Sequence, residues 1–325
     1  MASIRYLLAM LFALGSLLAT AAGPAGPTLE RLAADIAARV SDPDERARAA
    51  FDWIAQHIDY DGEAYQHRKV PELKPDDILR SGKTVCQGYA ELLTALLGKL
   101  GVKSASIPGY AKGGGYIEGE HFSRKNHQWN AIRLKKGWVL VDVTWGAGSV
   151  DSEGRFTRQY SGFWFDVPPS LFAINHYPAD SRYAFLPRQP TLADWENGFH
   201  IGAGILEQLL SNGFSAAQIL AGVQLRSLPA AYQVENPQLQ IISAPPGGVL
   251  RQGPRYMFEV QAAPPTKVAL QIGEQTLSPE WQGDIARFSI TIPAIRGQLY
   301  LLRSRNQGQH FYTDYDLVAS WRIVD

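Results

Sequence analysis

The sequence predicts an α+β protein in which helices come first, a short antiparallel sheet follows, and a β-sandwich ends the chain. Apolar residues recur with a helical period in the first hundred residues and again over residues 195–225. Between residues 104 and 145 the apolar period changes to two, as in half-buried strands. After residue 234, short apolar runs alternate with Pro and Gly clusters, which is typical of a sandwich.

Composition excludes some classes of function. The 325 residues predict about two domains at roughly 150 residues each, and 46% apolar residues can supply real cores. Lys plus Arg number 31, as do Asp plus Glu, so no overall field attracts nucleic acid or anionic lipid. We therefore expect no nucleic-acid partner.

The first 22 residues have the pattern of a secretory signal. Arg5 gives a positive start, residues 6–18 are apolar, and Ala19-Thr20-Ala21 fits a cleavage site before Ala22. The alternative is an uncleaved membrane anchor, for which the apolar run is short. We expect an exported protein, periplasmic or secreted, with no stable membrane span after cleavage.

Two helices are predicted before the next landmark. The first covers residues 28–40, and the second opens at Asp42 with Pro43 in its first turn and ends near residues 60–62. Residues 63–80 are polar and interrupted by Pro, so we expect a surface loop there.

Residues 83–100 are predicted to form a helix that carries Cys86, the only cysteine in the chain. Thr84 or Ser81 is the expected N-cap, and Gly101 the expected stop. Cys86 then lies in the first turn, where backbone N–H groups and the helix dipole favour a thiolate. The alternative is that Cys86 is a small buried residue without chemistry.

After a strand at 104–107 and a mobile Gly-rich loop at 112–120, residues 127–134 and 138–145 are predicted to form a hairpin. A four-residue loop would pair Trp129 with Asp142 and leave His127 one diagonal step away. A three-residue loop would put His127 and Asp142 on opposite faces, so the chemistry requires an even loop or a bulge. A thiol nucleophile needs a nearby base and an acceptor that orients this base, so Cys86, His127 and Asp142 are the candidate catalytic residues.

The rest of the chain is predicted more coarsely. Residues 146–162 form a Gly- and Ser-rich excursion, and residues 195–225 are helical. Strands are expected at residues 239–242, 256–260, 268–272, 288–292, 299–302 and 317–323.

Three motifs resemble those of the transglutaminase-like superfamily, a relative of papain-type cysteine proteases: Thr-Val-Cys-Gln-Gly-Tyr-Ala at 84–90, His-Gln-Trp-Asn-Ala at 127–131, and Trp-Val-Leu-Val-Asp-Val-Thr-Trp at 138–145. Residues 163–168 and 172–178 are similar to the kyphoscoliosis-peptidase branch. The resemblance implies Cys86 as nucleophile, His127 as base and Asp142 as its orienter. It also implies a papain/transglutaminase-like core at 23–190, a helical connector at 191–233 and an immunoglobulin-like β-sandwich at 234–325.

Other site residues are weaker candidates. The Cys86 N–H is the natural first oxyanion donor. Gln56 and Trp53 are weaker candidates for a second donor, and packing on the helix face is the simpler role for both. Gln87, Trp129 and Trp145 adjoin the catalytic residues in the motifs. No cofactor and no metal are expected, and His176 is expected to be structural. No metal-ligand spacing links His57, His67, His121 and His200.

Two functions fit these features. The first is an exported Cys-His-Asp thiol enzyme, a hydrolase such as a cysteine protease or an acyltransferase, acting on peptide or protein amide bonds through a thioester. The second is a binding or scaffold module with a vestigial catalytic domain. In either case the C-terminal sandwich is a candidate surface for a protein partner.

Overall fold

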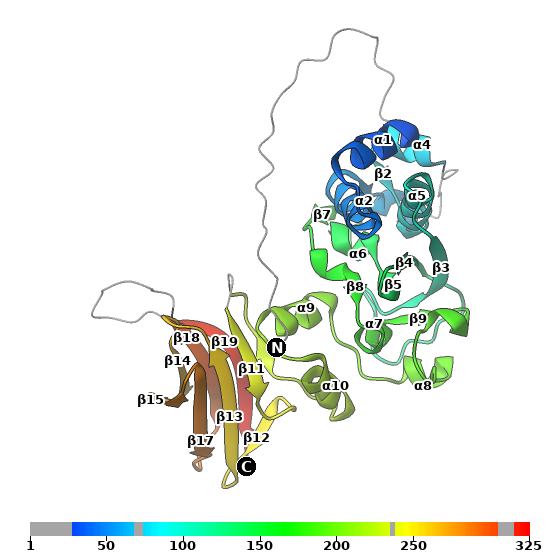
Figure 1. The fold of residues 1–325 in the computed structure, drawn as a ribbon. Coiled ribbons are helices and arrows are strands. Elements are labelled where there is room, and N and C mark those ends of the chain that lie inside the picture. Colours follow the sequence, from blue (N-terminus) through cyan, green and yellow to red (C-terminus); the bar gives the residue numbers. More distant parts are fainter. Residues whose placement is uncertain (1–27, 68–73, 235–237, 305–314) are drawn as a thin grey trace.

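An antiparallel five-stranded sheet in the order β8-β5-β4-β3-β9 lies at the centre of the first part of the chain (Figure 1). The computed structural model describes residues 28–67, 74–234, 238–304 and 315–325. The predicted signal at residues 1–22 lies outside these ranges. The sheet strands are β3 (Ser104–Ala111), β4 (His127–Leu134), β5 (Gly137–Val141), β8 (Phe165–Val167) and β9 (His176–Pro178).

Helices α1 (Leu29–Arg39), α2 (Pro43–His57) and α5 (Cys86–Lys99) pack together beside this sheet, with α5 against β3 and β4 (Figure 1). Asp42 caps α2 and Pro43 takes its first position, as predicted. The apolar faces bury Phe51, Ile54 and Leu93 completely, along with many similar residues. This core holds α5 rigidly against the strands.

The prediction of a surface loop at residues 63–80 is wrong. This stretch contains α3 (Gly62–Gln66) and α4 (Pro75–Ser81). Ile78 and Leu79 of α4 are buried. Two adjacent apolar residues in one short helix show no helical period, so the sequence pattern did not reveal this helix.

The N-cap predicted for α5 is also wrong. Thr84 belongs to β2 (Lys83–Thr84), which pairs in parallel with β1 (Asp59–Tyr60), and the N-cap is Val85, whose side chain makes no capping bond. The predicted stop is confirmed: Gly101 has φ 75° and the N–H of Val102 donates to Leu97 O at 2.9 Å.

The β4–β5 hairpin has the even register that the proposed chemistry requires. Leu134 pairs with Gly137, and the ladder continues to Asn130 opposite Val141. The predicted second strand is too long, because β5 ends at Val141 and Asp142 caps the short helix α6 (Val143–Ala147). The following excursion contains β6 (Gly148–Val150) and β7 (Phe156–Arg158). The 3₁₀ turn η1 (Gly162–Trp164) ends it, and α7 (Pro169–Asn175) follows β8.

The stretch predicted to be helical, residues 195–225, holds three short helices joined by non-helical links: α8 (Leu192–Glu196), α9 (Ala203–Ser211) and α10 (Ala216–Gln224). A short 3₁₀ turn, η2 (Ser181–Tyr183), precedes them. The Asn212 side chain donates to Val318 O at 2.7 Å, and β10 (Ala230–Ala231) pairs with β19 (Tyr315–Val324). The sequence analysis placed the start of the C-terminal sandwich at residue 234. In the structure, one of its sheets already includes residues 230–231.

Two sheets form the C-terminal part. One has the order β10-β19-β18-β14-β15 with β12 beside β19, and the other has the order β11-β13-β17-β16. Phe258 and Trp321 meet edge to face between them at 5.1 Å. No helix among the described residues has the length and apolar character needed to cross a membrane. The remaining strands are β11 (Leu239–Ser243), β12 (Val249–Arg251), β13 (Arg255–Ala262), β14 (Val268–Ile272), β15 (Gln275–Leu277), β16 (Glu280–Gln282), β17 (Ile285–Thr291) and β18 (Gly297–Ser304).

Candidate active site

Cys86 is the first residue of α5 and its side chain is almost completely buried. The chain enters the helix directly from β2, so the first turn of α5 packs against Thr84. Gly88 permits this contact, because a Cβ on Gly88 would lie 1.9 Å from Thr84 Oγ1. The N-cap residue of α5 makes no side-chain capping bond, so the backbone N–H groups of the first turn, where Cys86 lies, have no side-chain cap.

His127 begins β4 and lies between Cys86 and Asp142. Its Nε2 is 2.7 Å from Asp142 Oδ2, and its side chain also hydrogen-bonds with Cys86, for which Nδ1 is the remaining ring nitrogen. Burial alone would lower the pKa of His127. The charge and hydrogen bond of Asp142, together with Cys86, outweigh burial and raise the pKa of His127 to about 10.

Asp142 is completely buried, and its carboxylate accepts three hydrogen bonds. Oδ1 accepts from the N–H of Trp145 at 3.0 Å, while Oδ2 lies 2.7 Å from His127 Nε2 and 2.9 Å from His176 Nε2. Burial would raise the pKa of Asp142, but His127 and the hydrogen bonds of both imidazoles hold it well below its usual range. Asp142 is therefore ionised at neutral pH.

Sequence reasoning missed His176, which it treated as a structural residue outside the site. His176 begins β9, whose partner is β3, so the topology brings it to Asp142 across the sheet. Burial lowers the pKa of His176 below its ordinary value. A strand of three residues beside a Pro gives no sequence signal for such a pairing.

His127, Asp142 and His176 also form a group whose ligand atoms all lie within 4.8 Å of one another, close enough in principle for a metal ion. Two ligands on a tetrahedral zinc lie about 3.3 Å apart, from bond lengths of about 2.0 Å. The observed separations of 2.7 and 2.9 Å are those of hydrogen bonds instead. The arrangement fits a hydrogen-bonded chain better than an ion site.

Gln56 and Trp53, the weaker candidates for a second oxyanion donor, lie on α2. Gln56 is exposed on α2, and Trp53 stacks on His57 with ring centroids 4.5 Å apart. The structure brings Tyr60 to Cys86: its hydroxyl hydrogen-bonds with the Cys86 side chain and backbone N–H. Burial and the neighbouring Cys86 raise the pKa of Tyr60 far above its ordinary value, so the hydroxyl stays protonated.

The other weak candidates have different positions. Gln87 is exposed, whereas Trp129 is buried with its ring centroid 6.0 Å from that of His127. Trp145 lines the cavity beside His127, and the centroids of the two rings lie 5.7 Å apart. Only Trp145 of these three is placed to contact a ligand.

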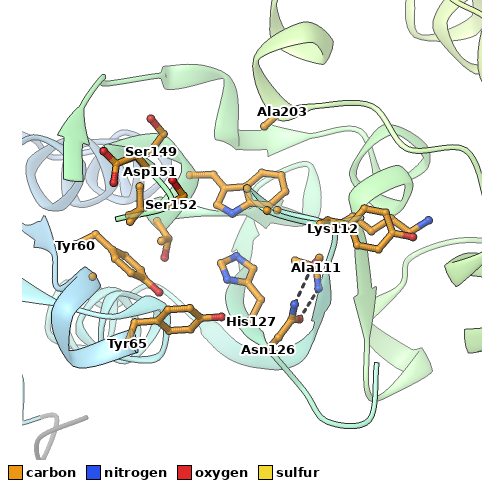
Figure 2. A pocket seen from close by; sticks show the side chains of 18 of the residues that line it. Tyr60, Tyr65, Ala111, Lys112, Asn126, His127, Ser149, Asp151, Ser152 and Ala203 are labelled. Atoms are coloured by element: carbon orange, nitrogen blue, oxygen red, sulfur yellow. Dashed lines mark hydrogen bonds between the residues drawn. The ribbon is translucent and has the colours of Figure 1, made fainter. Parts of the chain in front are cut away.

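A cavity of about 720 Å³ opens beside His127, within the range of small-molecule and peptide sites. Figure 2 shows Tyr60 and Tyr65 on one side of His127 and Lys112 on the other. The predicted mobile Gly-rich loop starts at Lys112, and this residue is anchored. Its Nζ donates to Trp195 O at 2.6 Å and Gly198 O at 3.0 Å, and burial lowers its pKa to about 8.

Residues 30–143, which contain the three candidate catalytic residues, match the family model described as the transglutaminase-like superfamily. This segment is a transglutaminase-like domain. The resemblance stated from the motifs is therefore confirmed, and with it the mixed helix-and-sheet fold of the core.

The transglutaminase-like domain also has named relatives. Mouse kyphoscoliosis peptidase is 40% identical over 174 residues, which cover 53% of this chain and 26% of that protein. Hillarin from Drosophila melanogaster is 28% identical over 189 residues, or 52% of this chain and 22% of that protein. The chain thus spans about a quarter of the length of these relatives. A solved structure, the periplasmic domain of TgpA from Pseudomonas aeruginosa, aligns with a TM-score of 0.30 at 18% identity, over 39% of this chain and 45% of that chain.

Proposed function

We propose that this protein is an exported thiol enzyme that cleaves or transfers amide bonds of peptides or proteins. One observation carries the proposal: a buried His127–Asp142 pair, joined at 2.7 Å, hydrogen-bonds with the cysteine at the start of α5. A charged imidazole beside a thiol at a helix N-terminus supports a nucleophilic thiolate.

In the first step the Cys86 sulfur attacks the amide carbonyl carbon, a C–S bond forms, and the carbonyl electrons move onto oxygen. The Cys86 N–H and the Tyr60 hydroxyl both adjoin the attacking sulfur. Because the Tyr60 hydroxyl remains protonated, both groups can donate to the developing oxyanion.

In the second step the C–N bond breaks and His127 transfers its proton to the leaving amine, which leaves a thioester on Cys86. Asp142 keeps the imidazole oriented throughout this transfer. Water then resolves the thioester to a carboxylate in hydrolysis, or a second amine resolves it to a new amide in acyl transfer. Both outcomes pass through the same first half-reaction.

A second function, a binding or scaffold module, is favoured by one observation. Cys86 is only 8% exposed, and the Tyr60 hydroxyl lies against it, so the resting site is covered. In that case the transglutaminase-like domain would bind a partner without turnover, and the C-terminal sandwich would add a second binding surface.

p-Nitrophenyl acetate separates these two functions, because it acylates a reactive thiolate without requiring the natural substrate. The enzyme predicts release of p-nitrophenolate and one acetyl group mapped by mass spectrometry to Cys86, which water then removes. The Cys86→Ala variant contains no thiol and must lose this adduct. An adduct that persists in Cys86→Ala, or no adduct in the wild type, supports the binding module.

A further inference from the structure

One oxygen of Asp142 serves two histidines. Oδ2 lies 2.7 Å from His127 Nε2 and 2.9 Å from His176 Nε2. The side chains of Asp142 and His176 are fully buried, and that of His127 is 8% exposed. The mechanism above assigns His127 and Asp142 but leaves His176 without a role.

Packing fixes the orientation of the His176 ring. Its face stacks on Phe172 with centroids 3.8 Å apart and an angle of 20°, and Trp145 lies 4.4 Å away. The backbone of His176 pairs with Ala111 in the sheet. With the ring held in this way, its Nε2 can reach one acceptor, which is Asp142 Oδ2.

The protons of the cluster can be assigned. Asp142 is ionised and His127 carries two N–H groups, because its pKa is raised. A carboxylate only accepts hydrogen bonds, so His176 Nε2 carries an N–H that donates to Asp142 Oδ2. Nδ1 lies 3.2 Å from Phe172 O, and burial lowers the pKa of the His176 ring below its ordinary value.

We propose that His176 is a positioning residue of the active site, whose Nε2–H holds the Asp142 carboxylate in the rotation that presents Oδ2 to His127. This inference rests on the proposed thiol chemistry. The N–H of Trp145 fixes Oδ1, and the Nε2–H of His176 gives Oδ2 a second donor besides His127. Without His176, Oδ2 can follow the His127 ring as it moves, and His127 no longer stays aligned with Cys86.

Four variants test the donor separately from the ring. His176→Phe keeps the stacking on Phe172 but has no N–H. His176→Gln has no ring but places an amide nitrogen where Nε2 lies, whereas the shorter His176→Asn cannot reach Asp142. His57→Phe is the matched control, because His57 also stacks on an aromatic residue and bonds a backbone carbonyl, on the exposed end of α2.

The measured quantity is the rate at which iodoacetamide alkylates Cys86 at about pH 7, with the melting temperature of each variant beside it. We expect a fall of about tenfold or more for His176→Phe and His176→Asn, since misalignment in a catalytic chain has effects of this size. His176→Gln should stay within about threefold of the wild type, although its melting temperature falls because the stacked ring is lost. His57→Phe should not change the rate.

Two results would overturn the role of His176. One is that His176→Phe or His176→Asn, if it folds, is alkylated at Cys86 as fast as the wild type. The other is an equal loss of rate in the Gln and Asn variants that follows melting temperature alone. Failure of the thiol chemistry is distinguishable, because then the wild-type protein itself reacts no faster than a free cysteine peptide and Asp142→Asn changes nothing.

Discussion

His127 Nε2 and Asp142 Oδ2 lie 2.7 Å apart because the turn between β4 and β5 contains two residues. Leu134 pairs with Gly137, and the same ladder extended places Trp129 opposite Asp142. One residue more or less in this turn would move Asp142 to the other face of the sheet. The geometry of the candidate site therefore depends on the hairpin register.

Tyr60→Phe should affect acylation but spare alkylation. Removal of one oxyanion donor is expected to slow acylation of Cys86 by p-nitrophenyl acetate about 10²-fold. Alkylation by iodoacetamide forms no oxyanion, so its rate should change less than about threefold. Tyr65→Phe is the control, since Tyr65 lies edge to face with Tyr60 at 6.0 Å. Equal losses in both reactions of Tyr60→Phe would assign Tyr60 to the thiolate instead of the oxyanion.

Gly88→Ala should destabilise the start of α5. The new Cβ would lie 1.9 Å from Oγ1 of the buried Thr84, and we expect a loss of about 1–3 kcal/mol in the free energy of unfolding. Gly98→Ala in the same helix meets nothing within 4 Å and should gain about 0.5–1 kcal/mol. Urea unfolding of both variants measures these changes. Equal effects at the two sites would disprove the close contact with β2.

The His127–Asp142 interaction should make stability depend on pH. The pKa of His127 rises from 6.5 to about 10 on folding, so the folded state holds this proton more tightly. The resulting stability is complete below pH 6.5 and is lost as the pH rises toward 10. The difference in melting temperature between the wild type and His127→Gln should therefore shrink across this window. A difference that is constant from pH 6 to about 10 would contradict the raised pKa.

Export predicts a processed N-terminus. The mature protein should begin at Ala22, with residues 1–21 removed. Intact-mass measurement of the protein recovered outside the cytoplasm checks this. A cell-bound chain that still carries Met1 or Ala2 would instead indicate an anchor.

The sequence indicated those parts of the site that are governed by local pattern. The apolar stripe placed Cys86 in a first turn. The alternation of two strands put His127 and Asp142 on one face only for an even loop, and the two-residue turn of the structure meets this condition. Tyr60 and His176 could not be found in this way. Tyr60 reaches Cys86 because β1 pairs with β2, and His176 reaches Asp142 because β9 pairs with β3. Both contacts depend on pairing of very short strands, which carry too few residues to show a period.

The end of β5 is a second feature that the local sequence pattern could not locate. Alternation continues through residues 138–145, yet the strand stops at Val141 because Asp142 caps α6 and accepts from the N–H of Trp145. Asp is a favoured N-cap, and the tertiary hydrogen bonds to two histidines override the strand pattern.

The proposed thiol chemistry depends most on Asp142. In Asp142→Asn, the amide oxygen can still accept from Trp145, so the fold should remain with a modest fall in melting temperature. The amide nitrogen then faces two imidazoles and cannot stabilise the charge on His127, and it favours the wrong tautomer.

The decisive measurement is the rate of Cys86 alkylation by iodoacetamide near pH 7, made on the wild type and Asp142→Asn together with their melting temperatures. The triad predicts a rate at least about tenfold lower in the variant, equivalent to about 1.4 kcal/mol. A lower melting temperature with an unchanged alkylation rate would contradict it, because Asp142 would then serve the fold alone.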